Sequence, residues 1–189
     1  MLTKDDMNER SGKLSPEGAR GLPLISEPDL LRLFEYWCSK RSGSLMPCKG
    51  DIDPIEISWA LSRIFLLDYS PEDGFRYRLA GAEVAEIFGR TNLKGFQLTD
   101  ILSPERAKMV AERWDPLVRD RCVTCMKGMV YLPAERIPIG ERLLLPLADT
   151  PDGPVTGLLG STVFKWVAGD LPQEIELSRI EYVPVDRIP

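Results

Sequence analysis

The sequence predicts an α+β fold built on an antiparallel sheet, because strand patterns and helix patterns occupy separate stretches of the chain. Two strand-length runs come first, a helical midsection follows, and three more strand-length runs complete the order. Turn residues join the first two runs and the last two, which is typical of hairpins. With 189 residues, 43% of them hydrophobic and 28% charged, the chain has the composition of one globular domain.

The N-terminal region has no sustained apolar period, so we expect a flexible tail over 1–26. It contains no apolar run long enough for a signal peptide, and no later segment approaches the roughly 20 apolar residues of a membrane helix. We therefore expect a cytoplasmic protein with no membrane partner. The four cysteines are expected to be free thiols, since a chain of this size does not need disulfides.

The first helix is predicted to begin after Ser26, which can cap it, with a proline tolerated in its first turn. Its apolar stripe is wider than one helix face requires. Such a helix can pack on its own domain or on a second chain, and both interpretations stay open. The residues expected at a homodimer interface are Leu30, Leu31, Phe34 and Trp37.

A short second helix is predicted to begin at Asp53, which can act as the cap, with a proline at the first helical position. Its buried residues would be Ile57, Trp59 and Leu61, unless these lead into the next strand. Strand patterns follow at 64–69 and 75–79. The residues between them, 70–74, combine Pro, Asp and Gly in an order that suits a tight connection. An antiparallel hairpin is therefore expected here.

The helical midsection consists of a short helix and a longer one. The short helix is predicted within 81–89, a segment with a glycine at each end. Ser103 is expected to cap the longer helix, and Pro116 should bend or restart it. The last third returns to strands, predicted at 123–132, 142–148 and 155–166. The expected organisation is a tail at 1–26, an N-terminal helical segment at 27–62, a core at 63–167 and a C-terminal extension at 168–189.

The chain contains no histidine, and this absence excludes several kinds of chemistry. Ser-His-Asp and Cys-His nucleophiles, histidine-ligated haem and HExxH zinc sites all need an imidazole. The net charge of -5 provides no field that would collect nucleic acid. Cys122 and Cys125 have the spacing of a metal or redox pair, yet residues three apart on a strand point to opposite faces. We expect a binding protein rather than an enzyme, with no metal site.

The central segment of the chain resembles the PAS domain. In PAS modules a strand leads into a short helix ending in Phe-Gly, then a Leu-x-Gly loop, a Leu-x-Asp run and a Pro-Glu helix start. The corresponding residues here are Phe75 to Gly81, Phe88-Gly89-Arg90, Leu93-Lys94-Gly95, Leu98-Thr99-Asp100-Ile101 and Ser103-Pro104-Glu105. The lead-in from Phe34 to Trp37 and at Asp51 to Pro54 is similar to a bacterial PAS-like family of often single-domain proteins.

The resemblance implies a five-stranded antiparallel sheet with helices on one face, in addition to the N-terminal helix. It also implies a space that holds haem, flavin or a small metabolite in some members and is filled core in others, and dimerisation through the N-terminal helix. The cofactor stays unknown. Histidine-ligated haem is not expected, and neither is cysteinyl-flavin photochemistry, because the loop at 90–94 has no cysteine.

The sequence thus suggests a non-catalytic sensory or regulatory module that binds a small metabolite, a signalling protein, or both. The alternatives are a pure protein-interaction adaptor with a filled core and, less favoured, a thiol-based redox or metal protein acting through Cys122 and Cys125. The residues expected to line a ligand pocket are Tyr77, Leu79, Val84, Phe88, Trp114, Arg142, Leu144, Leu159 and Ser161.

Overall fold

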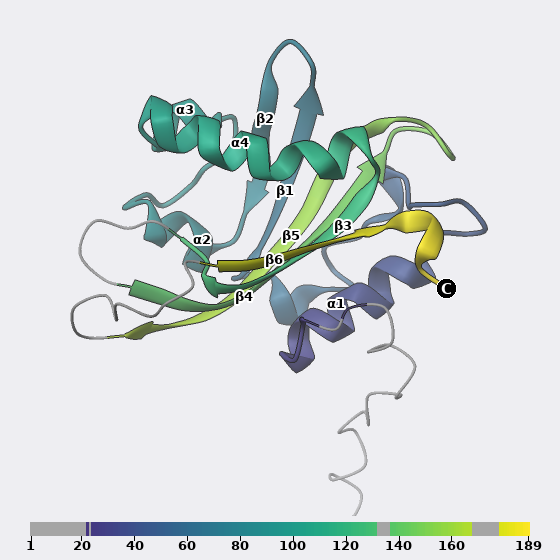
Figure 1. The fold of residues 1–189 in the computed structure, drawn as a ribbon, viewed down its shortest axis with the longest axis horizontal. Helices are drawn as coiled ribbons and strands as arrows, with labels where there is room; N and C mark the ends of the chain where they lie inside the picture. The colour runs from purple at the N-terminus through teal and green to yellow at the C-terminus, as the bar shows by residue number, and fades with distance from the viewer. Residues whose placement is uncertain (1–21, 23, 132–136, 168–177) are drawn as a thin grey trace, which may run out of the picture.

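The computed structural model describes residues 22, 24–131, 137–167 and 178–189, and its strands form one antiparallel sheet (Figure 1). The six strands lie in the order β2-β1-β5-β4-β3-β6. Their bounds are Ile64–Ser70 for β1, Gly74–Ala80 for β2, Cys122–Met129 for β3, Ile137–Ala148 for β4, Val155–Val167 for β5 and Ser178–Pro184 for β6. The predicted α+β class is confirmed, and one strand more than the expected five is present.

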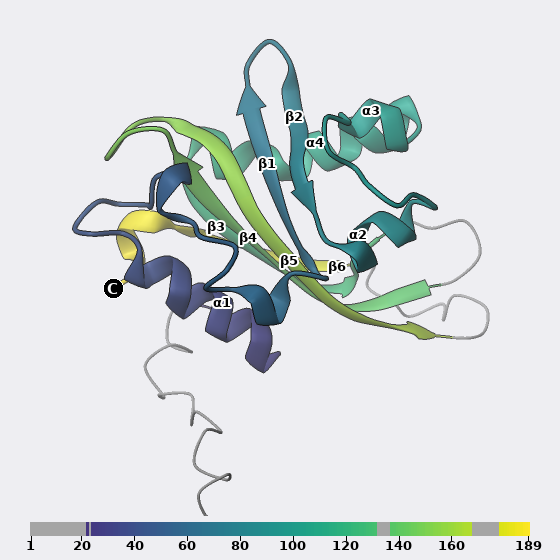
Figure 2. The same cartoon turned by 180° about the vertical axis from the view of Figure 1, so that it is seen from behind.

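The helices cover both faces of the sheet (Figures 1 and 2). The α-helices are α1 (Pro28–Ser39), α2 (Ala82–Ile87), α3 (Leu98–Ile101) and α4 (Pro104–Arg119). Short 3-10 turns lie at Lys49–Asp51, Ser58–Ala60 and Val185–Arg187. Helix α1 lies on one face, and α4 crosses the opposite face together with α2 and α3 (Figure 2). The sheet is therefore buried from two sides.

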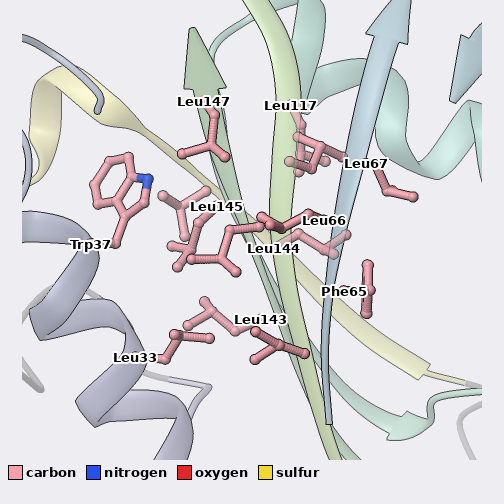
Figure 3. Close-up of a cluster of buried hydrophobic side chains, with 14 of the residues drawn as sticks. Leu33, Trp37, Phe65, Leu66, Leu67, Leu117, Leu143, Leu144, Leu145 and Leu147 are labelled. Atoms are coloured by element: carbon pink, nitrogen blue, oxygen red, sulfur yellow. The ribbon is translucent and has the colours of Figure 1, made fainter. Parts of the chain in front are cut away.

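Helix α1 packs its apolar stripe onto β4 (Figure 3). Trp37 is fully buried, and its indole Nε1 donates a hydrogen bond to the carbonyl oxygen of Pro146 at 2.9 Å. Figure 3 shows Leu33 and Trp37 pointing toward Leu143 and Leu145. Five residues of the stripe, Leu30, Leu31, Leu33, Phe34 and Trp37, are buried in the chain's own core, which accounts for most of its width.

Strand β4 is apolar on both faces because both faces are covered. Leu143, Leu144 and Leu145 are consecutive and all buried, with exposed fractions of 0%, 2% and 0%. Since side chains alternate along a strand, Leu144 lies on the face of α4 and its two neighbours lie on the face of α1. A run of this kind gives no polar-apolar alternation from which the faces could be assigned in advance.

Both ends of the chain depart from expectation. Leu22, Leu24 and Ile25 are buried in the core, although the sequence predicted a tail as far as residue 26; residues 1–21 and 23 lie outside the described part. The predicted C-terminal extension, of which 168–177 is likewise not described, contributes β6, which pairs antiparallel with β3. The tail carries no clear period and the extension alternates only weakly, so local pattern predicts neither the buried residues of the first nor the strand of the second.

Two helical predictions also differ from the structure. After Asp53 the chain forms a turn instead of the predicted helix, with the amide of Ile55 donating to the Asp53 carboxylate at 2.9 Å, and only a 3-10 turn follows at Ser58–Ala60. Of the two effects predicted for Pro116, the restart does not occur, because α4 runs through it as one 16-residue element. The missing donor of Pro116 interrupts only one hydrogen bond in a helix that its buried face, including Trp114 and Leu117, holds to the sheet.

The N-terminus of α1 is capped by a side chain from the sheet. Ser26 was the predicted N-cap, but the N-cap position is Glu27, and the Glu27 side chain makes no capping hydrogen bond to the helix. Instead the Glu141 carboxylate accepts the backbone amides of Ser26 and Glu27 at 2.7 and 3.0 Å. The ammonium of Lys127 donates to the same carboxylate at 2.7 Å. One buried acid on β4 thus satisfies the two backbone amides of Ser26 and Glu27, which lead into the first turn of α1.

Replacing this carboxylate is expected to weaken the fold in a pH-dependent way. Burial acts to raise the pKa of Glu141, but Lys127 and the donors of Ser26 and Glu27 outweigh it and hold that pKa below its ordinary value. The stabilisation is therefore complete above the unfolded value of about 4.3 and is lost as the pH falls through the lowered folded pKa. Glu141→Gln should cost about 2 kcal/mol at pH 7, measured by urea unfolding, and much less at pH 3.

A matched control for this variant is Glu112→Gln. Glu112 pairs with Lys108 at 3.9 Å on the exposed surface of α4, where an ion pair contributes little. Equal losses for the two variants at pH 7, or a loss at Glu141 that does not shrink at low pH, would contradict the capping role.

Candidate functional site

A cavity of about 60 Å³ lies between the sheet and the helices α2, α3 and α4. Its floor comes from β1, β2, β3, β4 and β6, and Trp114 of α4 contributes to its roof. Aromatic rings form much of the wall: the ring centroids of Phe65 and Trp114 are 6.5 Å apart, and those of Phe88 and Tyr131 are 6.0 Å apart. The space is enough for a few water molecules or a small organic group.

Five of the nine residues that the sequence suggested for a ligand pocket line this cavity. They are Tyr77, Phe88, Trp114, Arg142 and Leu144. The other four, Leu79, Val84, Leu159 and Ser161, do not line it. Val84 is buried in α2 but packs within the core away from the cavity.

Strand register explains why three of the suggested residues miss the cavity. Leu159 and Ser161 of β5 stand opposite Leu145 and Leu143, so they share the face of α1. On β2 a bulge changes the alternation: Tyr77 pairs with Leu67, but Leu79 pairs with the adjacent Leu66. The extra residue between them turns Leu79 to the face opposite that of Tyr77.

The polar centre of the cavity is Arg142, which is only 8% exposed. Its Nε donates to the hydroxyl of Thr162 at 3.0 Å, and its guanidinium lies 4.2 Å from the centroid of the Tyr131 ring. The Nη2 atom of Arg142 is buried without a hydrogen-bond partner. The hydroxyls of Thr124 and Tyr131 are also buried and unpartnered. Three polar groups at one cavity therefore have unused hydrogen-bonding capacity.

The charge at the cavity is positive. Arg113 of α4, which is half-buried, joins Arg142 in the wall, and no Asp or Glu of the described residues lines it. Burial raises the pKa of the Tyr77 phenol far above its ordinary value; Tyr131 adds to the rise, and the positive charge of Arg142 opposes it. Tyr77 is therefore neutral, and among the described residues that line the cavity the guanidinium of Arg142 is the one buried charge.

The pattern of the PAS domain family matches residues 25–162 of this sequence, which is most of the chain and includes every element from α1 to β5 except the end of β5. The chain belongs to the PAS domain family. PAS domains are in general sensory signalling modules without catalysis of their own. The cavity of this PAS domain lies inside the matched segment, apart from the contribution of Ile180 on β6.

Comparison with solved structures gives a match to the crystal structure of the Rhodobacter sphaeroides LOV protein. The two chains are 17% identical, the match covers 60% of this PAS protein and 68% of the LOV protein, and the TM-score is 0.36. No protein of curated function matches the chain. Within the described ranges, no helix combines the length and apolar character needed to cross a membrane.

Cys122 and Cys125 of the PAS core do not come together at one metal or redox site. Cys122 and Cys125 lie on β3 and are three residues apart, so they face opposite sides of the sheet. Burial raises the pKa of Cys125 to about 12 and also raises that of Cys122, which keeps both thiols protonated and unreactive at neutral pH. In the part of the chain that the structure describes, no group of three or more His, Cys, Asp or Glu could hold a metal ion.

The four residues suggested for a dimer interface lie in the core of the PAS protein itself. Leu30, Leu31, Phe34 and Trp37 have exposed fractions of 0%, 9%, 3% and 0%. A second chain could reach these side chains only if α1 left the sheet. Self-association through α1 stays a prediction.

Sequence reasoning missed the unpartnered hydroxyls of Thr124 and Tyr131. Thr124 stands opposite Leu144, and Met126 stands opposite Arg142, so alternation along β3 would have found Thr124 once the face of Leu144 was known. Tyr131 falls within the strand predicted at 123–132 but lies just beyond the observed β3, so strand alternation does not assign its side chain to the cavity.

Proposed function

We propose that this PAS domain is a non-catalytic sensory module that binds a small molecule in the cavity beneath α4. The observation that supports the proposal most strongly is the buried Arg142, whose Nη2 atom has no hydrogen-bond partner inside a largely apolar cavity. An unsatisfied buried donor destabilises a protein by about 1–3 kcal/mol, and more if it is charged, unless a ligand or ordered water satisfies it.

The size of the cavity limits the ligand that we propose. A space of about 60 Å³ is smaller than the roughly 300–1,000 Å³ of pockets that enclose drug-sized ligands. Haem or flavin would require α4 to move away from the sheet, whereas a small metabolite would need only side-chain adjustments. The metabolite is therefore the better match to the observed geometry.

The test is a search for a retained or stabilising small molecule, using the full chain. The protein is purified without denaturation, and its intact mass under native conditions is compared with the mass after denaturation. A small-molecule mass at up to one per chain, or a thermal shift with a member of a metabolite panel, is the expected result. Absence of both across the panel would overturn the proposal.

A second candidate function, a protein-interaction adaptor, is favoured by the same small cavity. If the space holds only water, the PAS domain acts through its surface, and we propose a cytoplasmic signalling protein or a second copy of this chain as its partner. Light scattering on the full chain, together with the search for a retained compound, distinguishes these roles. Self-association without ligand retention would support the adaptor.

A further inference from the structure

The residues that line the cavity beneath α4 indicate the charge of its ligand as well as its size. We propose that the ligand is a small monocarboxylate with an apolar body, and that its carboxylate binds the guanidinium of Arg142. This inference rests on the proposed sensory function and specifies the chemical class that the sensor recognises.

The first argument is the missing counter-charge. No ion pair of Arg142 is found among the described residues, although the side chain is more than nine-tenths buried. Burying a charge without a partner costs several kcal/mol, and most buried arginines are therefore paired with acids. The contacts that Arg142 does make, to the Thr162 hydroxyl and the Tyr131 ring, are both to neutral groups. An anion from outside the chain would complete the set.

The second argument is the geometry of the unused donors. A guanidinium presents planar pairs of N–H groups that match the two oxygens of a carboxylate. Nη2 of Arg142 is free, and the hydroxyls of Thr124 and Tyr131 in the same cavity wall are also unpartnered. Both hydroxyls can donate to an anionic oxygen. One charged group and two neutral donors are suited to one carboxylate.

The third argument is the rest of the wall. Phe65, Tyr77, Phe88 and Trp114 surround the cavity with rings, which favour an apolar body attached to the carboxylate. Among the described residues that line the cavity only one cation is buried, so a dianion such as phosphate would keep an uncompensated charge. Arg113 stands at the edge, half-buried, where its charge attracts an anion without being desolvated.

The experiment compares acids with their neutral isosteres on the full chain. The probes are hexanoate with hexanamide and benzoate with benzamide, and binding is measured by calorimetry, with any compound that the purified protein retains identified by mass. We expect each acid to bind at least about 30-fold more tightly than its amide, since a hydrogen bond to a charged group is stronger than one to a neutral group. A retained compound is expected to be a monocarboxylate.

The variant Arg142→Met should remove the preference for acids, and it should not lower stability in the absence of ligand because it removes an unpaired buried charge. Arg113→Met is the matched control and should keep most of the preference. The wild-type comparison of acid with amide needs no variant and so remains decisive if Arg142→Met does not fold.

The outcomes separate this inference from the proposed function. Equal binding of acids and amides, tighter binding of inorganic phosphate, or a retained compound without a carboxylate would overturn the carboxylate assignment while supporting small-molecule sensing. If no probe binds and no compound is retained or stabilises the protein, both proposals fail.

Discussion

Trp37→Ala is expected to lower the free energy of unfolding by about 3–5 kcal/mol, as removal of a large buried aromatic side chain usually does. The indole is fully buried between α1 and β4, and its Nε1 holds the carbonyl of Pro146 at 2.9 Å. The substitution therefore leaves a cavity and also an unsatisfied backbone acceptor. Urea unfolding followed by far-ultraviolet circular dichroism measures the loss.

Two control variants separate packing from hydrogen bonding. Trp37→Phe keeps most of the buried ring but loses the bond to Pro146, so about 1–2 kcal/mol of the loss should remain. Trp166→Ala removes an indole that is 43% exposed and should change stability by less than about 1 kcal/mol. A small effect at Trp37 would show that α1 is not held to the sheet as described.

Gly140→Ala is expected to cost about 3 kcal/mol, because a side chain at this position meets backbone atoms. A Cβ atom there would lie 2.0 Å from the carbonyl oxygen of Val163 and 2.6 Å from the Cα of Phe164, both on β5. Backbone atoms cannot rotate away, so β4 and β5 would have to separate where Gly140 stands opposite Phe164. Thermal unfolding should show a clearly lowered midpoint.

Gly50→Ala is the matched control, since a Cβ at Gly50 would have no atom within 4 Å. It should change stability by no more than about 0.5 kcal/mol. If Gly140→Ala were as well tolerated as Gly50→Ala, the close approach of the two strands would be incorrect.

Local patterns predicted most of the elements. The expected strands at 64–69 and 75–79 are β1 and β2 to within a residue at each end, because alternation and turn chemistry both act over a few residues. The start of α4 followed from Ser103, whose hydroxyl accepts the amide of Arg106 at 3.4 Å. These features depend on neighbours in sequence, so the sequence alone was sufficient for them.

The features that were missed depend on contacts between distant segments. Ser26 looked like a helix cap, but the cap is a carboxylate from Glu141, which lies 115 residues away in the chain. Strand β6 has only a weak pattern of its own and is stabilised by the edge of β3. Strand β5 is covered on both faces, so its sequence shows no polar-apolar alternation that would assign Leu159 and Ser161 to the face of α1. On β2 the bulge at Arg78 reverses the alternation and turns Leu79 to that same face.

Glu141 and Arg142 are adjacent on β4, yet they serve opposite faces of the sheet: one carboxylate caps α1, and one guanidinium lines the cavity. Their side chains leave the same stretch of backbone in opposite directions. A rotation of β4 about its own axis that carries Arg142 further toward a bound anion must also displace Glu141 relative to the amides of Ser26 and Glu27. The cavity and the start of the N-terminal helix thus depend on two adjacent residues, joined by a single peptide unit.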